Sequence, residues 1–120
     1  MRKDPSIFVG HVIESIGFIQ EDIKDASLDD FRASRQLQDI VIRRIEIIGE
    51  AVKNLSPEVK DRYPDVPWKR IAGMRDILSH GYFGVDLDLV WNVAIDELGP
   101  LKLRLQEIKR ELEEGAAPNG

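Results

Sequence analysis

The chain has 120 residues and a formal net charge of −5, and apolar residues make up 42% of it against 32% charged residues. This length suits one domain with a single core, and the acidic balance argues against a broad basic surface for nucleic acid. No apolar run approaches the roughly 20 residues that cross a bilayer, and the absence of cysteine excludes disulfides and thiolate zinc sites.

A first helix is predicted from Pro5 to about Lys24. Asp4 offers a side-chain acceptor at the N-cap, and a proline at the first helical position loses no hydrogen bond there. Apolar residues then recur at helical spacing on one stripe, at Val9, Val12, Ile13, Ile16, Ile19 and Ile23. His11 lies off this stripe, and we interpret it as a surface or interface residue.

A second, longer helix is predicted from Ser27 to about Leu55. Ser27 with Asp30 three residues later is typical of a capping box, which marks the beginning of a helix. The pattern also allows a break between residues 32 and 35.

The apolar surface of this second helix is broad. Ile42 and Ile47 lie off the main apolar face, which predicts a helix that is central or shared with a partner subunit. Gly49 in mid-helix costs roughly 1 kcal/mol against alanine, and it predicts a close approach of another helix or subunit. The main face itself consists of Leu37, Ile40, Val41, Ile45, Ile48, Val52 and Leu55.

Prolines divide the middle of the chain. The Ser-Pro pair at 56–57 predicts a short helix to about residue 62, and the two prolines within 63–67 predict a connection. Pro67 then predicts the first position of a third main helix that reaches about Ser79. Its expected inner face consists of Trp68, Ile71, Met74 or Arg75, and Leu78. Gly81 suits the residue that follows the end of this helix.

Asp86 begins the last helical segment, whose apolar residues continue past Pro100 and predict a kinked helix or two abutting helices. The apolar positions are Val90, Ala94, Leu98, Leu101, Leu105, Ile108 and Leu112. Residues 115–120 are expected to be a flexible tail, which leaves one helical domain at residues 1–114. Since no strand pattern is present, the predicted fold is an all-α, antiparallel up-and-down bundle.

Reactive side chains gather around the end of the third main helix. His80 lies where unpaired carbonyls favour the imidazolium form, which suits general acid catalysis. Asp76, one turn earlier, is placed to orient that ring, and the guanidinium of Arg75 suits a phosphate. Such a metal-free set suits cleavage of RNA by its own 2′-hydroxyl, because histidine moves protons and arginine stabilises the phosphorane. With only two histidines in the chain, a multi-histidine metal site is disfavoured and no cofactor is expected.

Helix geometry complicates this site within one chain. Residues five apart on an α-helix, such as Arg75 and His80, are rotated by about 140° from each other. A two-fold axis that brings two copies of this helix end together would build one composite cleft, so a homodimer is expected. The alternative reading is purely structural: Arg75 pairs with a carboxylate such as Glu46 or Glu50, and His80 caps its own helix.

Together with its surroundings, this segment resembles the HEPN superfamily and specifically the HepT-like toxins. Residues 75–82, Arg-Asp-Ile-Leu-Ser-His-Gly-Tyr, are similar to that family's motif of arginine, four residues, histidine, one residue and tyrosine. The likeness extends to residues 47–53, 67–68, 73–75 and 81–86. These stretches follow the family's order and span most of residues 5 to 112.

The resemblance implies a helical, dimeric, metal-independent endoribonuclease whose Arg75 and His80 lie at the subunit interface. It implies the toxin of a type VII-like toxin–antitoxin pair, with RNA, transfer RNA among the candidates, as substrate. The antitoxin would be a minimal nucleotidyltransferase that attaches AMP to Tyr82. Asp76 stands where close relatives often carry asparagine, and it sets a negative charge beside the phosphate.

Two other functions remain open at this point. In one, the protein is a non-catalytic binding module in which Arg75 and His80 hold nucleotide or phosphate for a partner transferase. In the other, it is a dimerising structural bundle. Tyr82 together with His80 favours the toxin, because a passive scaffold needs neither beside Arg75. A cytoplasmic location is expected by default.

Overall fold

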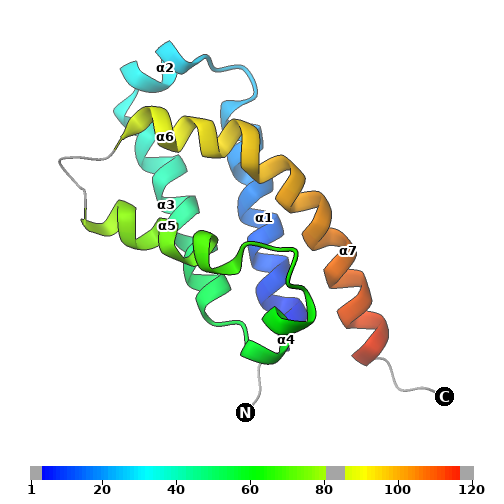
Figure 1. Cartoon of the computed structure of the whole chain (residues 1–120). Helices are drawn as coiled ribbons and strands as arrows, with labels where there is room; N and C mark the ends of the chain where they lie inside the picture. The colour runs from blue at the N-terminus through cyan, green and yellow to red at the C-terminus, as the bar shows by residue number, and fades with distance from the viewer. Residues whose placement is uncertain (1–3, 81–85, 117–120) are drawn as a thin grey trace.

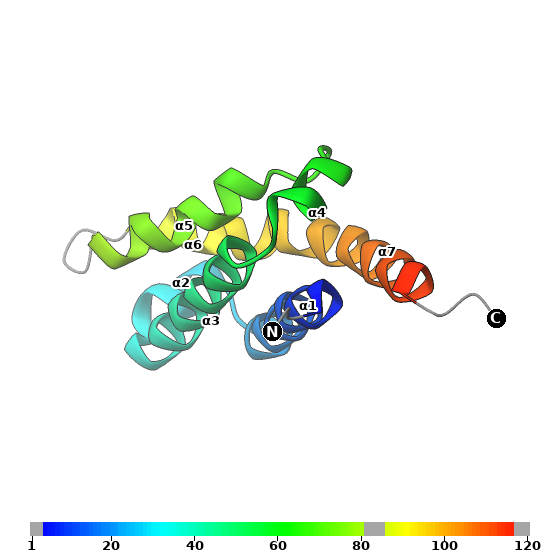
Figure 2. The same ribbon diagram turned by 90° about the horizontal axis from the view of Figure 1, so that it is seen from below.

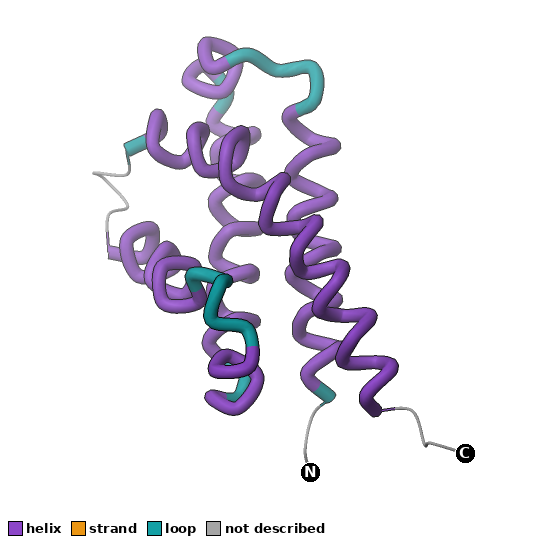
Figure 3. The backbone as a smooth tube through the Cα atoms, turned by 45° about the vertical axis from the view of Figure 1, so that its right-hand side comes forward, coloured by secondary structure: helices purple, strands orange, loops and turns teal. Residues whose placement is uncertain are grey.

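The computed structural model describes residues 4–80 and 86–116, without the side chains of 76–80 and 116. Within these residues the secondary structure is helical and contains no strand, which confirms the predicted all-α class (Figure 3). The elements, coloured along the chain in Figure 1, are α1 (Pro5–Ile23), α2 (Leu28–Ala33), α3 (Arg35–Lys53), α4 (Pro57–Arg62), α5 (Trp68–His80), α6 (Leu87–Asn92), the π-helical η1 (Val93–Glu97) and α7 (Leu98–Ala116).

The helices pack in two layers. Figure 2 shows α1 and α3 side by side in one layer and α5, α6 and α7 in the other. The chain runs in opposite directions in α1 and α3 and again in α1 and α7, so that α1 begins and α7 ends at the same end of the bundle (Figure 1). α5 lies across α3. The core between the layers is apolar and includes Val9, Ile16, Ile19, Val41, Ile48, Val52, Leu98, Leu105 and Ile108.

The predicted beginnings of α1 and α2 are confirmed by their caps. The Asp4 carboxylate accepts a hydrogen bond from the Ser6 backbone N–H at 2.9 Å. Ser27 and Asp30 form the expected capping box, because each side chain accepts from the other residue's backbone N–H. The break that the sequence allowed lies at Ser34, whose hydroxyl accepts from Leu37 N–H and so caps α3.

The apolar face of α3 agrees with the prediction except at one position. Val41, Ile45, Ile48, Val52 and the following Leu55 are buried. Ile40, which was expected on the same face, is 37% exposed, so that assignment was wrong. Its neighbour Val41 points into the bundle instead, since only one of two adjacent helical residues can lie at the centre of a packed face.

The last segment is one continuous ribbon through α6, η1 and α7 (Figure 1). The backbone N–H of Leu98 donates to the carbonyl of Val93, an i to i+5 bond. This π-helical turn ends three residues before Pro100, which has no N–H to give to the ordinary helical ladder. The expected kinked helix is therefore accommodated by a π-helical turn.

The connection before α5 is held by an internal hydrogen bond. The indole N–H of Trp68 donates to the carbonyl of Tyr63 at 2.9 Å, and both residues are buried. α5 begins at Trp68, so Pro67 precedes the helix and does not occupy its first position as predicted. The carbonyl of Pro67 accepts a hydrogen bond from the Ile71 N–H. Trp68 and Ile71 are buried, as expected for the inner face of α5.

Candidate functional site

The predicted motif lies on and after α5. Its backbone is helical through His80, and the side chain of Arg75 is described. The side chains of Asp76 and His80, and the whole of Tyr82, lie outside the described residues. Because α5 is continuous from residue 75 to residue 80, the positions of Arg75 and His80 are about 140° apart around the helix axis. The structure thus contains the geometric separation that was expected within one chain.

Arg75 is paired with a carboxylate of the neighbouring helix. Its Nε lies 3.1 Å from Oε2 of Glu50, with 37% of the Arg75 side chain and 53% of the Glu50 side chain exposed. Glu50 was one of the two partners named for the structural alternative; Glu46, the other, lies 3.9 Å from Arg43. Ion pairs this exposed contribute at most about 1 kcal/mol to stability. A phosphate can therefore compete for Arg75 at small cost.

Gly49 brings α5 close enough for this contact. A Cβ atom added at Gly49 would lie 2.8 Å from Cβ of Arg75 and 3.3 Å from the carbonyl oxygen of Ile71. Real side chains do not tolerate the shorter distance, and neither neighbour is the mobile end of a long chain. The predicted close helix approach at Gly49 is confirmed, and the helix that approaches carries Arg75 itself.

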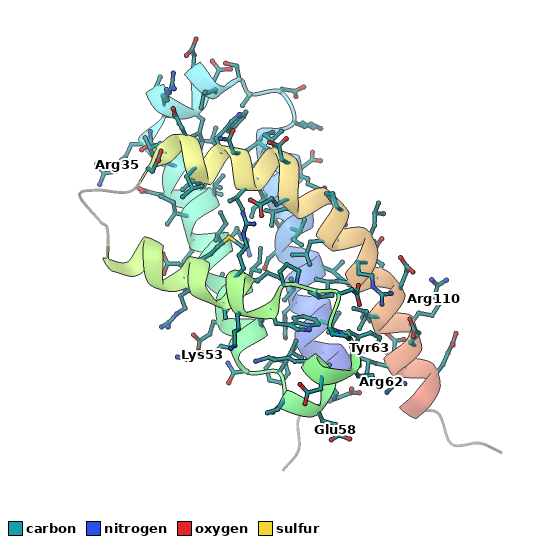
Figure 4. All side chains as sticks on the ribbon, viewed as in Figure 1. Arg35, Lys53, Glu58, Arg62, Tyr63 and Arg110 are labelled. Atoms are coloured by element: carbon teal, nitrogen blue, oxygen red, sulfur yellow. The ribbon has the colours of Figure 1, made fainter. Side chains whose placement is uncertain are left out.

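Charged side chains also tie α5 and its preceding loop to the far end of the chain. Arg70 lies 2.7 Å from Glu97, and Asp65 accepts a hydrogen bond from Arg104 at 2.7 Å. This hydrogen bond lowers the pKa of the Asp65 carboxyl below its usual value. Figure 4 shows the labelled Tyr63 near α7, and the Arg104 guanidinium lies 5.5 Å from its ring centre. These contacts hold the start of α5 and its preceding loop to η1 and α7.

A pocket of about 380 Å³ opens beside Arg75. Three helices contribute to it: His11 comes from α1, Glu50 from α3 and Arg75 from α5. The polar lining residues are His11, Arg43, Glu46, Glu50, Asn54 and Arg75. Its apolar lining residues are Phe8, Ile47 and Ala51.

The sequence analysis missed His11 as a site residue. It is exposed, as expected for a position off the apolar stripe of α1. However, His11 and Arg75 line the same pocket, although 63 residues lie between them in the sequence. The available signal was its rarity, because it is one of only two histidines.

Two kinds of feature are absent from the part of the chain that the structure describes. Among residues 4–80 and 86–116, no helix is long and apolar enough to cross a membrane. In the same ranges, no three histidine, cysteine, aspartate or glutamate side chains lie together as metal ligands would.

Comparison with known protein families finds one match. The family model described as Ribonuclease HepT-like matches residues 12–108, a span that contains the pocket residues except Phe8 and His11 as well as the whole motif. No solved structure matches the chain.

Several curated proteins are similar over nearly the whole chain. One from Methanocaldococcus jannaschii, named gamma-glutamylcyclotransferase and putative RNase, is 52% identical over 94% of this chain; the chain spans only 51% of that protein. One from Caldanaerobacter subterraneus, named putative RNase, is 41% identical over 88% of this chain and 95% of its own length. One from Thermococcus cleftensis, named probable ribonuclease HepT, is 34% identical over 92% of this chain and all of its own length.

Proposed function

This chain belongs to the HepT-like ribonuclease family of the HEPN superfamily, and on that premise we propose that it is a metal-independent endoribonuclease. RNA is the substrate, and transfer RNA is a candidate because of the family resemblance. Arg75 and His80 are the proposed catalytic residues, and Asp76 supports them. The observation that carries the proposal is the placement of Arg75, which packs against Gly49 and opens onto the pocket between α1, α3 and α5.

The proposed reaction needs no added reactant. The 2′-oxygen of a ribose attacks the adjacent phosphorus as a base removes its proton, and the bond from phosphorus to the 5′-oxygen breaks. A proton from an acid then neutralises that leaving oxygen, giving a 2′,3′-cyclic phosphate and a 5′-hydroxyl end. His80 is suited to move these protons, and Arg75 is suited to stabilise the doubly charged phosphorane.

We place the complete site in a homodimer. The angle between positions 75 and 80 on α5 prevents their side chains from leaving the helix in one direction. A two-fold axis near this helix end would let Arg75 of one copy face His80 of the other. The apolar surface of α3 supports such an assembly, because Ile40 is 37% exposed and Ile42 is only half-buried.

We further propose that the protein is a cytoplasmic toxin controlled by a nucleotidyltransferase antitoxin. AMP attached to the hydroxyl of Tyr82 would put a bulky anion two residues from His80. That group would occupy the cleft and compete for the positive charge of Arg75. Tyr82 lies outside the described residues, so its role rests on its place in the motif.

The ribonuclease proposal predicts cleavage of total RNA in the presence of EDTA. The native protein should produce fragments with 2′,3′-cyclic phosphate ends, and His80→Ala should lower the rate by about 100- to 10,000-fold because it removes the proton-transfer group. DNA of the same sequence, which lacks the 2′-hydroxyl, should stay intact. Cleavage that disappears with EDTA and returns with Mg²⁺ would contradict the proposal. No cleavage by protein shown by mass spectrometry to be unmodified would favour the non-catalytic binding module.

The antitoxin proposal predicts that Tyr82→Phe escapes control. This variant loses the acceptor hydroxyl but keeps the ring, so its RNA cleavage should remain within about threefold of the native rate. Incubation with the nucleotidyltransferase and ATP should add the mass of AMP to the native protein and abolish its RNA cleavage. The Tyr82→Phe variant should keep both its mass and its activity. AMP transfer to Tyr82→Phe with loss of cleavage would place the acceptor elsewhere.

A further inference from the structure

The pocket between α1, α3 and α5 is lined by several residues other than Arg75 and its ion-pair partner Glu50. His11 and Phe8 come from α1, a helix that carries no part of the motif. His11 is exposed and able to reach a ligand. The pocket is thus continuous with the proposed catalytic arginine and extends away from it toward α1.

We propose that this pocket is a subsite for one unpaired nucleotide of the RNA next to the phosphate held by Arg75, with His11 and Arg43 as its contacts. The inference rests on the proposed ribonuclease function and adds the substrate class, single-stranded RNA, and two residues that recognise it. His11 and Arg43 are binding residues in this proposal, and proton transfer stays with His80.

Size and lining both favour one nucleotide. The volume of about 380 Å³ lies near the lower end of the roughly 300–1,000 Å³ of small-molecule pockets, a size that suits a single nucleotide. Phe8 and Ile47 supply apolar surface for a base, as in proteins that read unpaired RNA by packing bases on side chains.

The hydrogen-bonding groups suit a base better than a bare anion. An imidazole has two ring nitrogens, and in its neutral form one donates and the other accepts, as groups on the edge of a base do. The side-chain amide nitrogen of Asn54 donates to the backbone carbonyl of Glu50 at 2.8 Å. The side-chain oxygen of Asn54 is an acceptor. Glu46 and Glu50 add further acceptors, and their charges offset the attraction of Arg43 and Arg75 for a bare anion.

The charges of the pocket are balanced in the free protein and easily rearranged. Arg75 lies 3.1 Å from Glu50, and Arg43 lies 3.9 Å from Glu46 with 71% of its own side chain exposed. Phosphates on either side of a bound base would replace the two carboxylates as partners of these arginines. Because the formal charges cancel, tight binding requires the base, which gives the pocket a reason to select nucleotides over simple anions.

The first test measures affinity for a fluorescein-labelled, single-stranded RNA of mixed sequence. Every variant carries His80→Ala to prevent cleavage. Adding His11→Ala or Arg43→Ala should weaken binding about tenfold, the value of one hydrogen bond to a charged or polar partner. Arg44→Ala is the matched control, because it removes the same charge from the neighbouring position of α3, where the guanidinium lies 4.4 Å from the ring centre of Phe18 and outside the pocket. It should change affinity by less than about twofold.

The second test detects binding at the subsite through the NMR resonance of the His11 imidazole. The chain has only two histidines, so the imidazole NMR resonance that His11→Gln removes is that of His11. A nucleoside 3′-monophosphate should shift this resonance, whereas inorganic phosphate and ribose 5-phosphate should not. Equal shifts with inorganic phosphate would make the pocket an anion site and overturn the proposal, as would equal losses of RNA affinity for Arg43→Ala and Arg44→Ala.

The two proposals fail in different ways. If the native protein cleaves RNA but the His11 and Arg43 variants bind it as Arg44→Ala does, the subsite is wrong and the ribonuclease stands. If nucleoside monophosphate shifts the His11 resonance but RNA is never cleaved, the pocket binds nucleotides and the ribonuclease assignment is wrong.

Discussion

Arg75→Ala is expected to lower the rate of RNA cleavage by about 100- to 1,000-fold, the usual loss when one group that stabilises transition-state charge is removed. The fold should survive, because the lost ion pair with Glu50 is partly exposed and contributes at most about 1 kcal/mol. The measurement is the single-turnover cleavage rate together with the melting temperature. Arg75→Lys should recover only part of the rate, since an ammonium cannot bind a phosphate through two parallel hydrogen bonds.

Arg70→Ala is the matched control for this change. Arg70 is on the same helix and also forms an exposed ion pair, at 2.7 Å from Glu97. It lies in a different pocket, lined by residues 65–67 and by residues of α5, η1 and α7, and this pocket shares no lining residue with the one beside Arg75. Its substitution should leave the cleavage rate within about twofold. Equal losses in the two variants would show that surface charge in general, rather than Arg75, determines the rate.

Gly49→Ala is expected to damage stability and activity together. The new methyl group would lie 2.8 Å from Cβ of Arg75, so α5 must move away from α3. Such overpacking lowers the free energy of unfolding by about 1–3 kcal/mol, more than the gain of roughly 1 kcal/mol that alanine brings to a helix interior. Since the displaced helix carries Arg75, the cleavage rate should fall by about 10- to 100-fold. Denaturant unfolding and the single-turnover rate measure the two effects.

Gly73→Ala provides the comparison. It makes the same substitution inside α5, but a Cβ there meets nothing within 4 Å. It should keep the cleavage rate and raise the free energy of unfolding by up to about 1 kcal/mol. If both variants gained stability equally, the close approach at Gly49 would have no energetic consequence. If Gly49→Ala lost stability but kept full activity, the position of α5 would not control Arg75.

The exposed pairing of Arg75 with Glu50 is compatible with both a structural role and the proposed catalytic role. In the free protein Glu50 satisfies the guanidinium, as the structural reading of the motif expected. That reading and the catalytic one are compatible, because a solvent-exposed carboxylate can be replaced by a phosphate without leaving a buried charge unpaired. The ion pair is consequently no argument against a role in binding RNA.

Much of the local structure could be predicted from the sequence because it depends on neighbours along the chain. Asp4, Ser27 and Ser34 each accept a hydrogen bond from a backbone N–H two or three residues away. Such contacts form wherever the helix begins and need no other element. The spacing of apolar residues likewise identified the buried faces of α1, α3 and α7, and the residues around Arg75 indicated the family.

The tertiary structure alone decided which residues meet. The sequence did not separate Ile40 from Val41 on α3, because the boundary of a buried face depends on where the next helix crosses it. Nor did it choose between Glu46 and Glu50 as the partner of Arg75, a choice that follows from the approach of α5 over Gly49. His11 reaches the same pocket only because α1, α3 and α5 pack at this one place. Helix packing geometry arises from side-chain contacts between distant segments. It therefore cannot be predicted from the residues that surround one position in the sequence.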